Sequence, residues 1–139
     1  MRLHIYADGA CWGNPGPAAI GAVIKDEKQR KLVELSQYIG KGTNNQAEYK
    51  AVIAALQSAM KLGADEVVLH LDSELVIRQL SGKYKVKNAL LQPLHVRLKA
   101  LLKQFKGFSI NQVGHDGNEE AHVMATAALK QNMKADGSG

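Results

Sequence analysis

The segment Leu3–Pro17, with the sequence LHIYADGACWGNPGP, begins as a predicted strand and ends as a predicted turn. Apolar Leu3, Ile5 and Ala7 alternate with more polar residues, which is the pattern of a half-buried β-strand. The glycines and prolines that follow are typical of a tight turn. The strand therefore presents one carboxylate, that of Asp8, at the point where the chain leaves the predicted sheet.

Two further acidic residues occupy similarly marked positions. Glu48 stands at the head of a helical pattern, and Asp72 closes an apolar run. Taken singly, each acid has a simple structural role, as a turn residue, a first-turn helix acid or a helix N-cap. If the strands before Asp8 and Asp72 are parallel neighbours, however, both carboxylates lie at the sheet edge where α/β proteins bind ligands. Clustered carboxylates repel one another unless cations neutralise them, so we expect all three acids to meet around divalent metal ions.

Composition places broad limits on the protein. The chain has 139 residues, a net charge of +5 and a sequence pI near 9.4, which fits an ordinary basic domain or one that binds a polyanion such as nucleic acid. A single cysteine, Cys11, excludes an internal disulfide and suits a reducing compartment. We see no signal peptide and no membrane span, and we expect a cytoplasmic monomer without a membrane partner.

Hydrophobic periodicity and turn signals predict an α/β domain over residues 1–131. Residues 132–139 are expected to be a disordered tail or a vector-derived remnant. The first three strands follow one another closely and predict an antiparallel meander, and the elements follow the order βββαβααβα. The predicted strands cover 3–8, 20–24, 31–39, 66–71 and 108–113, and the predicted helices cover 44–62, 73–80, 89–105 and 118 to about 130.

Three stretches, in this order, resemble the signature motifs of the type 1 ribonuclease H family. They are Asp8-Gly9 with Gly13-Asn14-Pro15-Gly16, Thr43-Asn44-Asn45-Gln46-Ala47-Glu48, and Asp72-Ser73. The resemblance extends over roughly residues 2–131. It implies the ribonuclease H-like fold, a five-stranded mixed sheet flanked by helices, and an endonuclease that hydrolyses the RNA strand of RNA–DNA hybrids.

The resemblance also implies two metal ions, Mg²⁺ or Mn²⁺, held by Asp8, Glu48 and Asp72. In such a site one ion activates the attacking water and the other stabilises the leaving 3′-oxygen, with the ions about 3.5–4 Å apart.

Substrate contacts follow from the same motifs. The resemblance implies that a first group reads the hybrid backbone and the 2′-hydroxyls of the minor groove, and that a second group forms a phosphate pocket for the DNA strand. Turn formation is the alternative role for the asparagines. The first group is Cys11, Asn14, Asn44 and Asn45, and the second is Thr43 and Asn88.

Two departures from the family pattern affect binding. Glu74 stands where a glutamine is common, and the link between Leu80 and Asn88 is too short for the basic, tryptophan-bearing protrusion of some relatives. Three lysines in that link either supply part of the electrostatic grip on nucleic acid or form a solvated charge run. They are Lys83, Lys85 and Lys87.

The segment from Val113 to His122 resembles the last motif of one subgroup of the family. That subgroup has Arg or His at the position of His115, and usually a fourth Asp at the position of His122. The resemblance implies that His115 assists water activation or product release, with an ordinary surface loop residue as the alternative. His122 can still ligate a metal through a ring nitrogen; otherwise the fourth position would be Asp116 or Glu120.

The remaining histidines, His4, His70 and His95, are interpreted as structural or surface residues. Two other functions stay open beside the hydrolase. One is a module that grips hybrids or double-stranded RNA with catalysis weakened by His122. The other is a different nuclease or an integrase on the same fold, which the Gly-Asn-Pro-Gly and Thr-Asn-Asn motifs disfavour.

Overall fold

The structure is a computed structural model and describes residues 1–135. Its elements follow the predicted order βββαβααβα. They are β1 (Arg2–Cys11), β2 (Gly16–Lys25), β3 (Lys31–Gly42), α1 (Asn44–Lys61), β4 (Glu66–Leu71), α2 (Glu74–Leu80), α3 (Gln92–Leu102), β5 (Gly107–Gln112), the 3-10 turn η1 (His115–Asn118) and α4 (Glu119–Ala135).

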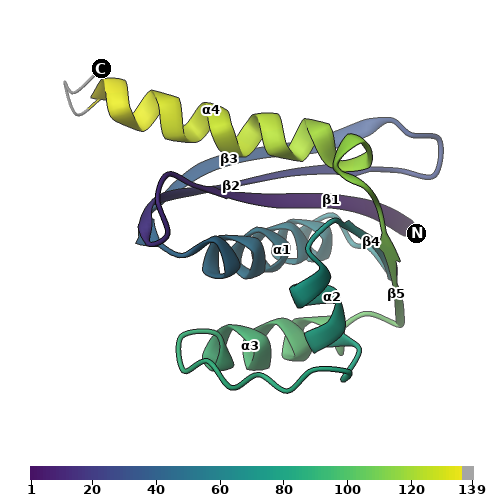
Figure 1. The fold of residues 1–139 in the computed structure, drawn as a ribbon. Helices are drawn as coiled ribbons and strands as arrows, with labels where there is room; N and C mark the ends of the chain where they lie inside the picture. The colour runs from purple at the N-terminus through teal and green to yellow at the C-terminus, as the bar shows by residue number, and fades with distance from the viewer. Residues whose placement is uncertain (136–139) are drawn as a thin grey trace.

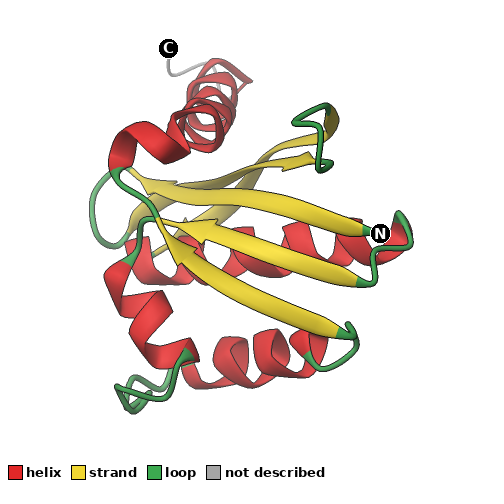
Figure 2. Cartoon of the chain, turned by 90° about the vertical axis from the view of Figure 1, so that its right-hand side faces the viewer, coloured by secondary structure: helices red, strands yellow, loops and turns green. Residues whose placement is uncertain are grey.

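The five strands form one mixed sheet in the order β3-β2-β1-β4-β5. β1, β2 and β3 are antiparallel, as the meander predicted, whereas β1 with β4 and β4 with β5 are parallel. One face of the sheet is covered by α1, with α3 packed against α1, and the opposite face carries α4 over β1, β2 and β3 (Figures 1 and 2). This arrangement confirms the predicted five-stranded mixed sheet flanked by helices.

The parallel pairing of β1 with β4 sets the position of two acids. Leu3, Ile5 and Ala7 of β1 are fully buried, as their alternation predicts. Tyr6 lies directly opposite His70 in the register. Asp8 and Asp72 each follow two residues later, so the two carboxylates lie side by side just beyond the last β1–β4 pair. The prediction that these strands are parallel neighbours is therefore correct. Contrary to the sequence prediction, Asp8 does not mark the end of its strand, because β1 stays paired with β2 as far as Cys11.

Two glycines allow the helices to approach the sheet closely. A Cβ on Gly9 would lie 2.5 Å from the Ala47 carbonyl carbon, so the start of α1 rests on the β1 backbone. A Cβ on Gly21 would lie 2.1 Å from the Ala121 carbonyl oxygen, so α4 rests on β2 in the same way. The helices that carry Glu48 and His122 are thus held at backbone contact distance from the sheet.

Helix α3 is shorter than predicted, because the chain makes a turn before it. The Asn88 carboxamide oxygen accepts the Leu90 N–H at 2.8 Å, and helical structure begins only at Gln92. Pro93 lies in the first turn, where its missing N–H is harmless, as predicted.

Helix α4 extends beyond the predicted end of the domain at residue 131 and runs to Ala135. Residues 132–135 are therefore helical rather than part of a disordered tail. They are helix-compatible residue types, and the first glycine after them is Gly137. The remainder of the predicted tail, 136–139, lies outside the described residues. Within residues 1–135, no helix combines the length and the apolar character needed to cross a membrane.

Replacing Gly21 with alanine should force α4 away from β2, because the added methyl group would meet helix backbone rather than a movable side chain. We expect a loss of about 1–3 kcal/mol in the free energy of unfolding, the usual cost of overpacking. Chemical denaturation of Gly21→Ala measures it. Gly107→Ala is the matched control, since its Cβ would meet only the Glu66 side chain at 3.7 Å or more. Equal stability of the two variants would contradict the close approach.

Candidate active site

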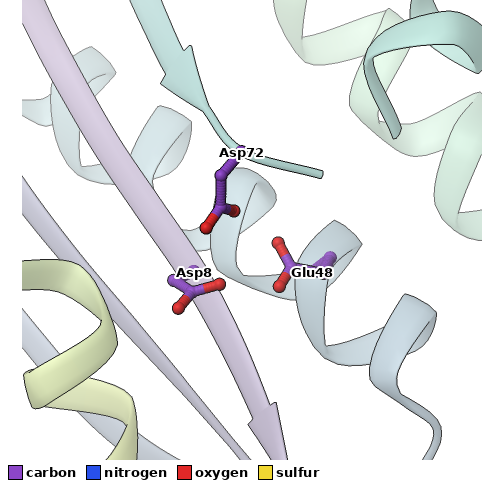
Figure 3. Close-up of side chains that lie close together, drawn as sticks. All are labelled: Asp8, Glu48 and Asp72. Carbon is purple, nitrogen blue, oxygen red and sulfur yellow. The ribbon is translucent and has the colours of Figure 1, made fainter. Parts of the chain in front are cut away.

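Three carboxylates from three separate elements converge at one edge of the sheet (Figure 3). Asp8 comes from β1, Glu48 from the second turn of α1 and Asp72 from the residue after β4. One oxygen atom of each lies within 4.8 Å of the others. Asp8 is only 4% exposed, and Glu48 and Asp72 are partly buried. The structure therefore brings together the three acids that the sequence predicted as metal ligands.

The start of α1 holds Glu48 in place. The Thr43 hydroxyl accepts the Gln46 N–H at 3.1 Å, and the Gln46 side chain accepts the Thr43 N–H at 2.9 Å. This capping box satisfies two backbone donors and fixes where the helix begins. The Gly9 N–H then donates to a Glu48 carboxylate oxygen at 3.1 Å, which links the helix to the strand beside Asp8.

Burial and the proximity of Asp8 make two of the three carboxyl groups, those of Glu48 and Asp72, harder to ionise. Burial, and then the neighbouring Asp8, raise the pKa of Glu48 well above its usual range. Burial and the charge of Asp8 also raise the pKa of Asp72, while a hydrogen bond from Asn118 acts in the opposite direction. Neighbouring cations would favour the ionised forms of both acids.

The donor set fits a hard divalent cation. All three groups offer carboxylate oxygens, which Mg²⁺ and Mn²⁺ prefer over nitrogen or sulfur. A cation at this position would also offset the burial and the nearby charge of Asp8, which together raise the pKa values of Glu48 and Asp72. The residues that could hold metal here are therefore Asp8, Glu48 and Asp72.

Two histidines flank the carboxylates. His122 Nδ1 lies 2.9 Å from an Asp8 carboxylate oxygen. His115 Nδ1 lies 4.0 Å from an Asp72 oxygen, and its side chain is 67% exposed. The two imidazole rings meet edge to face with their centroids 5.1 Å apart. Both residues thus lie where the sequence placed them, next to the acids; metal ligation by His122 stays a prediction.

The other two candidates for a fourth ligand point elsewhere. The Glu120 carboxylate binds Lys25 at 2.7 Å and Lys31 at 2.9 Å, over the sheet rather than at its edge. Asp116 lines a separate cavity together with Lys25 and Glu120. Neither belongs to the group of converging carboxylates. Of the candidates for a fourth ligand, only His122 contacts one of the three acids, and its role as a ligand stays a prediction.

Most of the predicted substrate contacts lie around the β1–β2 turn and the start of α1. The Asn14 side chain accepts the Asn44 N–H at 3.0 Å, which ties the turn to the helix. The Cys11 thiol donates to the carbonyl oxygens of Gly13 at 2.6 Å and Gly42 at 3.2 Å. Asn45 is exposed in the first turn of the same helix. These contacts join the β1–β2 turn to the start of α1, the helix that carries Glu48.

Thr43 and Asn88 also make structural contacts. Thr43 caps α1, and Asn88 closes the turn before α3. The Asn88 side chain is exposed and comes from a different segment of the chain. The phosphate-binding role of both residues stays a prediction.

Asn118 is a site residue that the sequence did not reveal. It is 1% exposed, and its Nδ2 donates to the Ala7 carbonyl oxygen at 2.7 Å. Among the described residues, none supplies a hydrogen bond to its Oδ1. The side chain fixes η1, which carries His115, against the end of β1. An asparagine at the start of a helix is common, so only its burial distinguishes this one.

Comparisons with known proteins identify the family. Residues 6–128 match the model of the family described as reverse transcriptase-like. The chain is 44% identical over 128 residues to Ribonuclease HI of Halobacterium salinarum, covering 92% of this chain. It spans 64% of the length of that relative, which is less than two thirds.

Two solved structures have nearly the same fold. The crystal structure of RNase H1 from Halobacterium salinarum superimposes with a TM-score of 0.92 at 43% identity, covering 94% of this chain and 99% of that chain. LC11-RNase H1, solved in complex with an RNA/DNA hybrid, gives a TM-score of 0.89 at 37% identity over 94% and 99% of the two chains. The three motifs, the sheet order and these matches lead to one conclusion: the chain belongs to the reverse transcriptase-like family and, within it, to the type 1 ribonucleases H.

Proposed function

We propose that this protein is a metal-dependent endoribonuclease that hydrolyses the RNA strand of RNA–DNA hybrids. The observation that carries the proposal is the convergence of Asp8, Glu48 and Asp72 from three elements onto one point. The relative LC11-RNase H1, which was solved with an RNA/DNA hybrid, supports the choice of substrate.

The three carboxylates would hold the metal, with Mg²⁺ or Mn²⁺ as the proposed ions. When bound, a pair of such ions supplies an activated water and stabilises the leaving 3′-oxygen. The protein's own contribution is positioning, because each acid is anchored to a rigid element. The Gly9 N–H fixes Glu48, and parallel pairing fixes Asp8 and Asp72. His115, in an exposed turn 4.0 Å from Asp72, is placed to exchange protons with solvent near the scissile bond.

The surface around the β1–β2 turn would bind the hybrid. Asn14, Asn44 and Asn45 offer amide groups to the minor groove, where 2′-hydroxyls distinguish RNA from DNA. Lys83, Lys85 and Lys87 are exposed between α2 and α3 and can bind phosphates. Glu74 forms an ion pair with Arg78, which partly neutralises the negative charge that Glu74 adds to the proposed hybrid-binding surface.

We further propose that the protein acts as a monomer in a reducing, cytoplasmic compartment. The presence of one cysteine in the sequence supports the reducing compartment.

Removing any one carboxylate should abolish most of the activity. We expect Asp8→Asn, Glu48→Gln and Asp72→Asn each to lower hybrid cleavage at least about a hundredfold, since phosphoryl transfer depends on metal positioning and charge stabilisation. The measurement is turnover of a labelled hybrid with Mg²⁺ or Mn²⁺. Asp65→Asn is the matched control, because Asp65 lies before β4 at the opposite edge of the sheet.

Near-normal turnover in one of the three variants would remove that residue from the ligand set. Hybrid binding by the wild type without cleavage in either metal would instead favour the binding module.

Cleavage should require ribose at the cut position, and binding should weaken steeply with salt. Changing Lys83, Lys85 and Lys87 to glutamine should lower the slope of log affinity against log salt by about one unit for each phosphate that is no longer neutralised. Binding is measured with a hybrid, a DNA duplex and an RNA duplex over a salt series. The matched control changes Lys28, Lys61 and Lys106, which lie at the opposite edge of the sheet. Equal cleavage of the DNA duplex, or the same slope in both triple variants, would contradict the proposed interface.

His122→Asp tests the fourth position. The new carboxylate would lie beside Asp8, so the metal-free protein should melt at a lower temperature; one like-charge contact costs on the order of 1 kcal/mol. Mg²⁺ should bind more tightly, and any preference for Mn²⁺ should narrow, because Mn²⁺ tolerates imidazole better. Melting in chelator and metal titrations of cleavage measure both effects.

Thr126→Asp is the matched control, as it adds the same charge one turn later on α4. If His122→Asp changes neither the melting temperature nor the Mg²⁺/Mn²⁺ activity ratio, His122 lies outside the metal site.

A further inference from the structure

An open cavity of about 510 Å³ lies between α3 and the link that joins α2 to α3. The link runs alongside α3 (Figure 1), and the Gln92 side chain of α3 donates to the Val86 carbonyl oxygen of the link at 3.0 Å. None of the three converging acids lines this cavity. Its volume falls in the range of roughly 300–1,000 Å³ that is usual for small-ligand sites.

One lining residue, Gln79 of α2, is a buried polar side chain. It is only 6% exposed, and its Oε1 lies 2.5 Å from the Tyr49 hydroxyl of α1. This short distance suits a hydroxyl that donates to an oxygen. The carboxamide is therefore oriented with Oε1 toward Tyr49, and no described residue accepts a hydrogen bond from its Nε2 amide. The amide is available as a donor to a ligand in the cavity.

The imidazole of His95 supplies an acceptor to the same cavity. Tyr49 uses its hydroxyl proton on Gln79, so its oxygen can only accept from His95 Nδ1, which lies 3.4 Å away. Burial, and then the neighbouring Lys99, lower the pKa of His95, so the ring is neutral near pH 7. With the proton on Nδ1, Nε2 carries a lone pair. A donor and an acceptor are thus held beside one tyrosine hydroxyl.

An aromatic ring and apolar side chains form further parts of the lining. Tyr84 is 46% exposed, and the Arg78 guanidinium lies over its ring at 5.2 Å and donates to its hydroxyl at 3.1 Å. Arg78 thereby holds the ring in place. Val86 and Val96 add apolar surface. Proteins hold planar nucleobases by stacking on such rings and by contact with apolar side chains.

The charged side chains of the lining are basic. They are Lys85 from the link and Lys99 from α3, and neither forms an ion pair with a described residue. No acidic side chain lines the cavity. Lys83 and Lys87 stand on either side of Lys85 in the exposed link. The cavity therefore favours a ligand with a negative charge.

We propose that this cavity binds one nucleoside monophosphate unit. The planar base lies against Tyr84, with its hydrogen-bonding edge toward Gln79 and His95. The phosphate is bound by Lys85 and Lys99. A nucleobase carries neighbouring donor and acceptor groups on its pairing edge, which matches a carboxamide donor beside an imidazole acceptor.

The nucleotide can be free or can be an unpaired residue at the end of a strand, because both present the same base and phosphate. The proposal goes beyond the proposed hydrolase and does not depend on it, since none of the metal-binding acids takes part.

The test measures nucleotide binding in chelator, so that no metal ion can hold a phosphate at the acids. AMP, GMP, CMP and UMP are titrated by calorimetry beside inorganic phosphate, and we expect at least one nucleotide to bind at one site and more tightly than phosphate. Lys99→Gln should weaken this binding about fivefold, because one charge contact is lost. Lys103→Gln is the matched control, since Lys103 lies one turn later, outside the lining, and should change nothing.

Three outcomes would overturn the proposal. They are the absence of saturable nucleotide binding, phosphate that binds as tightly as every nucleotide, and equal affinity of the two lysine variants.

A second measurement needs no variant. On addition of the tightest-binding nucleotide, the side-chain amide signals of Gln79 and the imidazole signals of His95 should shift in the NMR spectrum. The signals of Gln104 and His4, which lie outside the lining, should not shift. Shifts confined to the region of Asp8 and Glu48 would equally overturn the proposal.

Hybrids distinguish the two sources of the nucleotide. A blunt hybrid is compared, in chelator, with four hybrids that each carry one unpaired nucleotide at a different strand end. Tighter binding of an overhanging hybrid, reduced by Lys99→Gln, assigns the cavity to a strand end. Equal binding of all five hybrids, together with the expected nucleotide titration, assigns it to a free nucleotide.

Discussion

The convergence of three carboxylates on one point is the constraint on which the rest of this structure depends. Asp8, Glu48 and Asp72 each place an oxygen within 4.8 Å of the others, and partial burial removes much of the water that would screen them. Burial first, and then the neighbouring Asp8, raise the pKa values of Glu48 and Asp72. Such an arrangement persists because rigid elements hold each acid, and a divalent cation would convert the repulsion into binding free energy.

The surrounding fold supplies the rigidity. The parallel pairing of β1 with β4 places Asp8, within β1, beside Asp72, which follows the end of β4. Gly9 lets α1 rest on β1, so that the third acid reaches the same point, and Gly21 does the same for α4 and His122. Buried Asn118 ties the turn that bears His115 to β1. The two glycines therefore position the site, because they let the helices that carry Glu48 and His122 pack closely on the sheet.

The distribution of charge separates two kinds of surface. Exposed lysines lie between α2 and α3, on the side of the sheet covered by α1 and α3, where a phosphate backbone would be attracted. On the other side, Lys25 and Lys31 are paired with Glu120 and Arg2 with Glu27, which leaves the imidazoles of His4 and His70 beside neutralised groups.

Local patterns along the chain were enough to predict the order of the elements, the three acids and the family. Strands show as alternation, turns as glycine and proline, and each motif consists of residues that stand close together in the sequence. The same patterns misplaced the start of α3, where a turn closed by Asn88 takes the place of the first predicted helical residues. They also misplaced the end of α4, which continues to Ala135. The resemblance to the family also led us to expect His115 and His122 beside the acids, whereas the role of Asn118 and the contacts that join these residues emerge only from the folded chain. His122 contacts Asp8 across 114 positions of sequence, and Asn118 reaches Ala7 across 111. Folding also brings His4 and His70, which look unrelated in the sequence, to within 2.9 Å. Contacts of this kind depend on strand register and on how closely a helix approaches the sheet, and both are set by packing between distant segments that no local pattern encodes.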